Sequence, residues 1–101
     1  MYEVLIDELV FKEDFKNIAN ADRQRIIRAI GRKLPVEPER YGRRLRGGLA
    51  GLWKLRVGRF RVVYEVKKDK VLVYVIKVGF RRDDEVYTET LKRIRRLKGH
   101  G

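Results

Sequence analysis

Hydrophobic and polar residues alternate along residues 52–57 and 59–66, on either side of Gly58. Such alternation predicts half-buried strands, and a glycine between two such runs predicts a tight hairpin turn. The alternation also sends four basic side chains to the other face, at the strand ends nearest the turn: Lys54, Arg56, Arg59 and Arg61. The pattern therefore predicts a hairpin that presents a patch of fixed positive charge.

A third strand is predicted at residues 71–78, which are hydrophobic at both alternating sets of positions. A strand of this kind is expected to be covered on both faces and to lie inside the sheet. Gly79 ends this run. A weaker alternation at residues 2–6 predicts a short strand near the start of the chain.

Three other segments repeat hydrophobic residues at helical spacing. The first carries Phe11, Phe15, Ile18 and Ala19, the second Ile26, Ile27, Ile30 and Leu34, and the third Tyr87, Leu91 and Ile94. Asn20 and Asp22 suit the start of the second helix, and Pro35 ends it. Asp83 or Asp84 can cap the third helix.

The predicted elements follow the order strand, helix, helix, three strands and a closing helix. At 101 residues the chain is long enough for one modest core, so we expect a single domain, residues 1–101. This β-α-α-β-β-β-α order predicts an α+β fold with a small, mostly antiparallel sheet and helices packed on one face.

Charge is the strongest compositional feature, with a formal net charge of +12 and an isoelectric point near 10.4. Residues 1–22 hold six acids and two bases, a net charge of −4, so the rest of the chain carries +16. Heat adaptation would explain many charges but not this excess of one sign. The balance therefore predicts a polyanion or an acidic protein as partner.

Several kinds of chemistry are excluded by the residues that the chain lacks. It has no cysteine and no serine, and its single histidine is His100, beside the C-terminus. Thiolate metal sites and Ser–His or Cys–His nucleophiles are therefore impossible, and we expect no metal or cofactor. The chain opens without a basic leader or a long hydrophobic run, so we expect a cytoplasmic protein without a membrane anchor.

Lysine, arginine and tyrosine remain as candidate catalytic groups, and together they can cleave RNA. Cleavage requires removal of the 2′-OH proton, stabilisation of the phosphorane charge and protonation of the leaving oxygen. A lysine beside other cations has a lowered pKa, which suits a general base. The same residue types would also bind nucleic acid without cutting it.

A glycine- and arginine-rich segment, residues 40–51, precedes the hairpin. Leu45 and Leu49 are its expected anchors in the core. Backbone amides and guanidinium groups in such a segment could hold phosphate, but it could equally be a surface connector.

The hairpin and the strand after it carry a recognisable set of motifs. These are Trp53-Lys54-Leu55-Arg56, then Gly58-Arg59-Phe60-Arg61-Val62-Val63-Tyr64, then a valine-rich strand ending at Gly79, Phe80 and Arg81, and finally Val86-Tyr87. Leu45-Arg46-Gly47 fits the segment that precedes them. The set resembles the toxins of the RelE/ParE superfamily, and the order of elements matches over nearly the whole chain.

By motif position the resemblance implies four catalytic residues: Lys54, Arg61, Arg81 and Tyr87. Lys54 is the implied general base, and Tyr87 stacks on or orients the substrate. Arg61 and Arg81 are implied to stabilise the scissile phosphate, and Arg81 is also the candidate donor to the leaving oxygen. We expect the neighbouring arginines to bind RNA: Arg43, Arg44, Arg46, Arg56, Arg59 and Arg82. Because arginine cannot act as a base near neutral pH, the base role depends on Lys54 alone.

Two of the catalytic candidates also have a structural alternative. Tyr87 lies on the hydrophobic stripe of the last helix and could simply pack in the core. Arg61 could pair with Glu65 or with an acidic loop.

Within the superfamily, RelE-type members are ribosome-dependent messenger RNA endonucleases, and ParE-type members poison DNA gyrase. The resemblance implies a toxin that cuts messenger RNA in the ribosomal A site, without a cofactor, by 2′-OH attack. It also implies an acidic, RelB-like antitoxin as partner. A gyrase inhibitor and a nucleic-acid-binding module without catalysis remain the alternatives.

Overall fold

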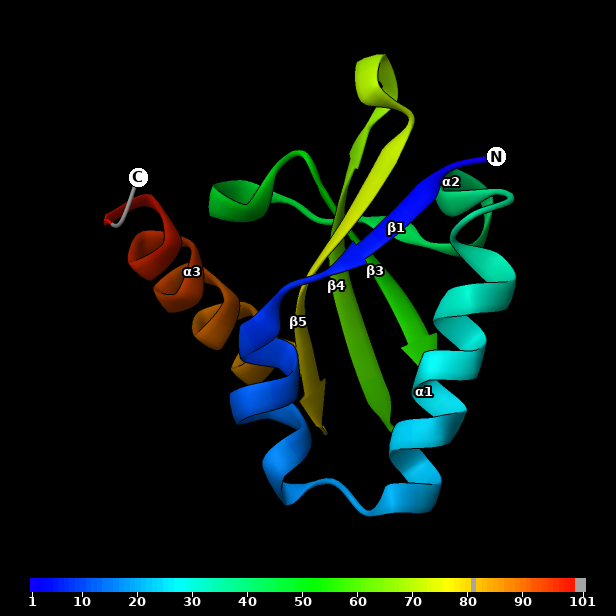
Figure 1. Cartoon of the computed structure of the whole chain (residues 1–101). Helices are drawn as coiled ribbons and strands as arrows, with labels where there is room; N and C mark the ends of the chain where they lie inside the picture. Colours follow the sequence, from blue (N-terminus) through cyan, green and yellow to red (C-terminus); the bar gives the residue numbers. More distant parts are fainter. Residues whose placement is uncertain (81, 100–101) are drawn as a thin grey trace.

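The computed structural model describes residues 1–80 and 82–99, except for the side chains of residues 98 and 99. Its five strands form one sheet in the order β1-β5-β4-β3-β2 (Figure 1). Their bounds are β1 Glu3–Ile6, β2 Arg43–Arg44, β3 Leu52–Val57, β4 Phe60–Lys67 and β5 Leu72–Phe80. Only β1 and β5 are parallel, and the other neighbours are antiparallel. The predicted α+β class and mostly antiparallel sheet are confirmed.

The hairpin between β3 and β4 turns at Gly58, as predicted. Val57 pairs with Phe60, so the turn contains only two residues, and Gly58 has a φ of +58°. A glycine adopts this left-handed conformation without the steric cost that a side chain brings. The turn fixes the register that places Arg56 opposite Arg61.

The short strand β2 was not predicted. It lies inside the glycine- and arginine-rich segment, between the single-turn helix α2 (Pro38–Tyr41) and the 3-10 turn η3 (Gly47–Leu49). Two residues are too few to show an alternating pattern, so sequence reasoning assigned them to an irregular segment. Leu45 and Leu49 are buried, as expected for anchors.

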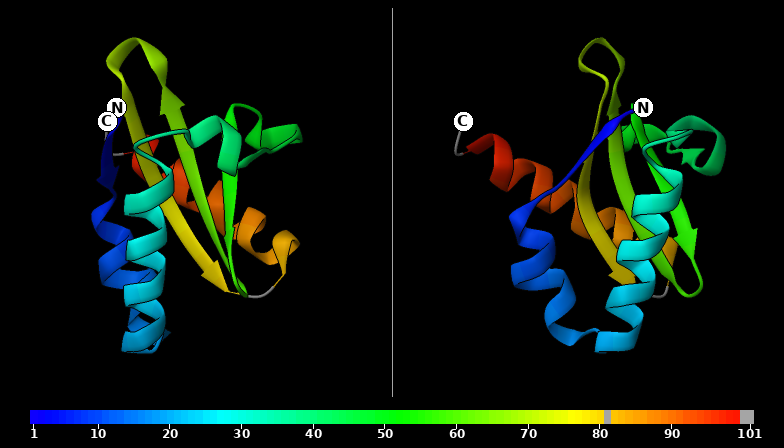
Figure 2. Two further views of the ribbon diagram at one scale, coloured as in Figure 1. Left: turned by 90° about the vertical axis from the view of Figure 1, so that its right-hand side faces the viewer. Right: turned by 45° about the vertical axis from the view of Figure 1, so that its right-hand side comes forward.

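One face of the sheet is covered by α1 (Asn20–Lys33) together with η1 (Val10–Asp14) and η2 (Phe15–Asn17). Figure 2 shows these helices as one layer beside the sheet. Residues from both layers form the larger core, which includes Ile26, Ile30, Val62, Tyr64 and Val75. Tyr64 is fully buried, and its hydroxyl donates to the carbonyl oxygen of Pro38.

The opposite face of the sheet is covered by α3 (Asp83–Gly99), whose first half lies behind the sheet in Figure 1. Leu52, Val63, Ile76 and Val86 form a second, smaller core there. The expectation that helices pack on one face therefore needs correction. The physical reason is β5, which contributes side chains to both cores and, as predicted from its two hydrophobic sets, is covered on both sides.

The first predicted helix is shorter and less regular than its periodicity indicated. It consists of the π-helical η1 and the 3-10 turn η2, and the chain is extended at Ile18. The cap before α1 is Ala19, without a side-chain hydrogen bond, so Asn20 does not cap the helix as expected. Asp22 lies in the first turn, at the positive end of the helix dipole, as expected. Asp14, within η1, instead bonds to β5 and α3, which holds this segment against the sheet.

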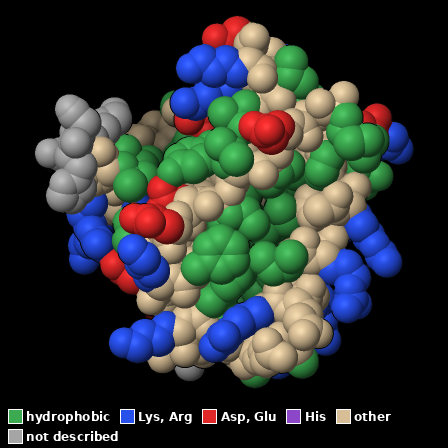
Figure 3. All heavy atoms as spheres, in the orientation of Figure 1, with side chains coloured by type: hydrophobic (Ala, Val, Ile, Leu, Met, Phe, Trp, Pro, Cys, Tyr) green, Lys and Arg blue, Asp and Glu red, His purple; other side chains and the backbone are tan. Residues whose placement is uncertain are grey.

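The face that α1 and η1 present to solvent is partly hydrophobic (Figure 3). Phe11 and Ile27 are exposed there and, with Phe15, line a shallow groove between the two helical segments. Figure 3 shows lysine and arginine side chains around its lower and right-hand edges. Within the described residues, no helix has the length and hydrophobicity to cross a membrane.

Candidate functional site: a cationic cluster at the start of α3

Two strands and one helix bring Lys54, Arg61 and Tyr87 to the same place. Lys54 on β3 and Arg61 on β4 lie on the α3 side of the sheet, because the alternation of each strand turns its other residues to the larger core. Tyr87 lies on the first turns of α3, and the Lys54 Nζ is 5.7 Å from the centre of its ring. Three of the four predicted catalytic residues are thus neighbours.

A carboxylate that was not among the predicted site residues joins the two cations. Asp83 Oδ2 accepts a hydrogen bond from Lys54 Nζ at 2.7 Å, and Asp83 Oδ1 accepts one from Arg61 Nε, also at 2.7 Å. Asp83 is the first residue of α3. Its two carboxylate oxygens bond to Lys54 and Arg61, so the side chain ties the start of α3 to both strands of the hairpin.

The position of Asp83 could have been found from its spacing to Tyr87. The two residues are four apart and so lie on the same face of a helix. A helix that turns Tyr87 toward Lys54 also turns Asp83 toward the hairpin. Sequence reasoning assigned the acidic residues to capping and solvation, and that assignment concealed the ion pair.

The electrostatics of the cluster differ from the expectation for a general base. The hydrogen bond to Asp83 is the main cause that raises the pKa of Lys54, and Tyr87 acts in the same direction. The hydrogen bond from Lys54, followed by that from Arg61, lowers the pKa of Asp83. The prediction that neighbouring cations lower the pKa of Lys54 is wrong for this arrangement, because the nearest charge is negative.

The two structural alternatives are each partly realised. Tyr87 is half-buried and packs against the smaller core, yet its ring also faces Lys54. Arg61 pairs with an acid, as the alternative proposed, but the partner is Asp83 rather than Glu65. Arg81, the fourth predicted catalytic residue, lies outside the described residues, and so does His100.

The predicted RNA-binding arginines divide between the two faces of the sheet. Arg43 pairs with Lys54 across β2 and β3, so its side chain lies on the α3 side. Arg44 pairs with Trp53 on the opposite face, where its guanidinium lies 5.2 Å from the centre of the indole ring. The remaining four are exposed to solvent: Arg46, Arg56, Arg59 and Arg82.

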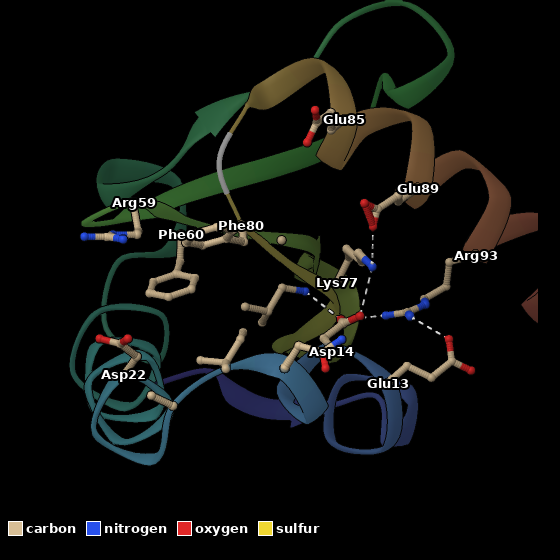
Figure 4. A pocket seen from close by; sticks show the side chains of 15 residues that line it. Glu13, Asp14, Asp22, Arg59, Phe60, Lys77, Phe80, Glu85, Glu89 and Arg93 are labelled. Carbon is tan, nitrogen blue, oxygen red and sulfur yellow. Dashed lines mark hydrogen bonds and ion pairs between the residues drawn. The ribbon is translucent and has the colours of Figure 1, made fainter.

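A separate cleft of about 550 Å³ opens between η1, α3 and the end of β5 (Figure 4). Arg59 is the only predicted site residue among those that line it, within the described part of the chain. Its floor is an ion-pair network in which Asp14 binds Lys77 at 2.9 Å and Arg93 at 2.6 Å. These three groups are buried and mutually satisfied, so the network holds α3 in place.

Metal ligands are not gathered anywhere in the described residues: no group of three or more carboxylates or histidines is placed to hold an ion. Buried polar side-chain atoms of the described part also all have hydrogen-bond partners. The groups present at the cluster are an ammonium, a guanidinium, a carboxylate and a phenol.

Solved structures with the same fold include toxins of toxin–antitoxin systems. The toxin–antitoxin complex RelBE2 of Mycobacterium tuberculosis matches with a TM-score of 0.74 and 25% identity over 79% of this chain and 98% of that chain. The isolated RelE toxin of Escherichia coli matches with a TM-score of 0.64 and 30% identity, over 93% of this chain and 99% of that chain. The fold is therefore that of a RelE-like toxin.

Sequence comparison leads to the same class of protein. Residues 9–85 match the model of the family described as ParE toxin of type II toxin–antitoxin system, parDE. The chain is also 54% identical to the mRNA interferase toxin RelE of Escherichia coli (strain K12) over 41 residues. That match spans 41% of this chain and 43% of the relative, less than half of each. This protein belongs to the RelE/ParE superfamily of toxins, as its motifs predicted.

Proposed function

We propose that this toxin is a ribosome-dependent, metal-independent messenger RNA endonuclease. The observation that supports it best is the convergence of Lys54 and Arg61 on one anion, the Asp83 carboxylate, beside the ring of Tyr87. Two cations that share one anion at hydrogen-bond distance have the spacing needed to hold the two non-bridging oxygens of a phosphodiester. The mRNA interferase relative supports the same activity.

Each predicted catalytic residue has a step in the proposed reaction. Arg61 and Arg81 stabilise the negative charge that develops on the phosphorane when the 2′-oxygen attacks. As the bond from phosphorus to the 5′-oxygen breaks, Arg81 donates a proton to that oxygen, which leaves as a hydroxyl, and regains a proton from solvent. Tyr87 stacks on the nucleotide or orients it. Lys54 takes the 2′-OH proton only as the neutral amine. The hydrogen bond to Asp83 stabilises its ammonium form, so the carboxylate must first move away and the ammonium must release a proton to solvent.

The proposed partners follow from charge and from the relatives. The RelBE2 neighbour was solved as a toxin–antitoxin complex, so we propose an acidic antitoxin that covers the cationic surface of this chain. The net charge of +12 also suits ribosomal RNA around the A site. Because ribosomes are the proposed place of action, the toxin would act in the cytoplasm.

Primer extension on a translated messenger RNA tests the proposal. The wild-type toxin should produce cuts at discrete positions, and Arg61→Ala and Arg81→Ala should abolish them. Arg28→Ala serves as the matched control, because Arg28 is an exposed arginine of α1 on the opposite face of the sheet, and it should cut normally. Absence of cuts by the wild-type protein on translating ribosomes would refute the endonuclease proposal.

A gyrase inhibitor is the second candidate, and the family match favours it. The matching model, residues 9–85, is named for the ParE toxins. This candidate predicts inhibition of gyrase supercoiling without any cut in messenger RNA. A supercoiling assay run with the same preparations separates the two functions.

A further inference from the structure

The anion position between Lys54 and Arg61 is already occupied by a group of this chain. Each oxygen of the Asp83 carboxylate binds a different cation, both at 2.7 Å. A bound phosphodiester would use its two non-bridging oxygens in the same way, because ammonium and guanidinium groups bind carboxylate and phosphate with similar geometry. The carboxylate and the phosphate therefore compete for one position.

Asp83 is also the outermost member of the cluster. The side chains of Lys54 and Arg61 are only 20% and 12% exposed, whereas that of Asp83 is 40% exposed. An anion that approaches from solvent consequently meets a negative charge before it reaches either cation. Like charges at such a short distance repel each other strongly where water is partly excluded.

We infer that Asp83 is a built-in competitor that closes the anion site, and that a phosphodiester binds Lys54 and Arg61 only by displacing its carboxylate. The inference rests on the proposed function for the class of ligand, a phosphodiester of RNA. The contact makes the resting toxin a weak binder of free phosphate-containing ligands.

The fold allows this displacement at little cost. Asp83 begins α3, so its side chain can rotate away without breaking the hydrogen bonds inside the helix. After rotation the carboxylate remains at the positive end of the helix dipole, which stabilises it there. The rest of α3 stays anchored by the buried Asp14–Arg93 pair, so the site can open without undocking the helix.

Two carboxylates in sequence provide a matched pair of variants. Asp83→Asn and Asp84→Asn remove the same charge from the same helical turn. Asp84 is 76% exposed, and its nearest described cation is Arg82, at 3.8 Å. A general increase in positive charge would affect both variants equally, and only the removal of a competitor is specific to Asp83.

Calorimetric titration with inorganic phosphate, and with a short RNA whose 2′-OH groups are methylated and cannot react, tests the inference. Asp83→Asn should bind both ligands roughly tenfold more tightly than the wild type, and Asp84→Asn should stay within about twofold of it. Affinities of Asp83→Asn and Asp84→Asn that agree within twofold would overturn the inference. Thermal unfolding of each variant shows whether it is folded. A second variant, Asp83→Ser, should give the same gain in affinity as Asp83→Asn, because both lack the carboxylate.

Failure of this inference can be distinguished from failure of the proposed function. The competitor role is decided by binding of phosphate and uncleavable RNA, which requires no catalysis and no ribosome. The endonuclease is decided by cuts in translated messenger RNA made by the wild-type toxin. If the toxin cuts RNA but Asp83→Asn shows no gain in affinity, only the competitor role of Asp83 is refuted and the endonuclease proposal stands.

Discussion

Arg93 Nη1 lies 2.6 Å from Asp14 Oδ2, and this contact joins α3 to η1 beside β5. The two side chains are only 4% and 1% exposed. Asp14 also accepts hydrogen bonds from Lys77 and from the backbone nitrogen of Val78, so one carboxylate connects η1, β5 and α3 (Figure 4). The position of α3, and with it the cationic cluster, depends on this buried anion.

Asp14→Asn should therefore destabilise the protein strongly. It leaves Lys77 and Arg93 buried without their shared anion, and removal of one partner from a buried ion pair costs about 3–5 kcal/mol. Urea unfolding measures the change. Glu89→Gln is the control: Glu89 is 52% exposed and contacts Lys77 from the solvent side, so its loss should cost about 1 kcal/mol or less. Equal losses for the two variants would contradict the role assigned to Asp14.

Gly79→Ala should disturb the start of α3 through packing alone. A Cβ atom at Gly79 would lie 2.3 Å from Cγ2 of Val86, which is buried on α3. The helix must shift away from β5, and overpacking of this kind typically costs about 1–3 kcal/mol. Urea unfolding should show this loss, and messenger RNA cleavage should fall because Asp83 and Tyr87 lie on the shifted turns.

Gly31→Ala is the matched control for that substitution. Nothing lies within 4 Å of a Cβ at Gly31, inside α1, so the alanine should stabilise the helix by about 0.5–1 kcal/mol. If Gly31→Ala lost as much stability as Gly79→Ala, the contact with Val86 would not be the cause of the loss at Gly79.

Periodicity and motif position were sufficient to predict the fold class and to select three residues that the structure brings together: Lys54, Arg61 and Tyr87. The alternation that turns Lys54 and Arg61 to one face of the hairpin is a local property, so the sequence reveals it. The side chain of Asp83 has no such pattern, because its partners are 29 and 22 residues away and are reached only after the helix docks. The irregular η1 was missed for the same reason: Asp14 is held by β5 and α3, which no local periodicity describes.

The closed state of the anion site should depend on pH in a defined window. The pKa of Asp83 is lowered from its ordinary value of 3.8, so its contribution to stability is present above that value and is lost as the pH falls through the lower folded value. The pKa of Lys54 is raised from 10.5, so its contribution is present below 10.5 and is lost as the pH rises through the higher folded value.

NMR titration that follows the carboxyl carbon of Asp83 and the Cε of Lys54 measures both limits of this window. In the wild type the Asp83 signal should move at the acid limit and the Lys54 signal at the alkaline limit, and Asp83→Asn should move the Lys54 transition to lower pH. A Lys54 transition that is insensitive to the Asp83 substitution would contradict the arrangement.

Tyr74 should report alkaline destabilisation. Burial, followed by its hydrogen bond to Asp7, raises the pKa of Tyr74 from 10.0 to about 12. A raised pKa stabilises the fold below the unfolded value of 10.0, and this stabilisation is lost as the pH rises toward 12. Tyrosinate absorbance recorded together with circular dichroism should show the loss, and Tyr74→Phe should reduce it. Tyr41→Phe, at an exposed position on α2, is the control, and the alkaline loss of circular dichroism should match that of the wild type.

Arg43 and Arg44 are adjacent in sequence but should differ in their effect on RNA. Arg43 lies across from Lys54, on the face that carries the cationic cluster, whereas Arg44 covers the ring of Trp53 on the other face. If RNA binds at the cluster, Arg43→Ala removes a phosphate contact, and the slope of log affinity against log salt should become shallower by about 0.7. Arg44→Ala should leave that slope unchanged and instead alter Trp53 fluorescence. Equal slopes for the two variants would place the RNA on a surface other than the α3 side of the sheet.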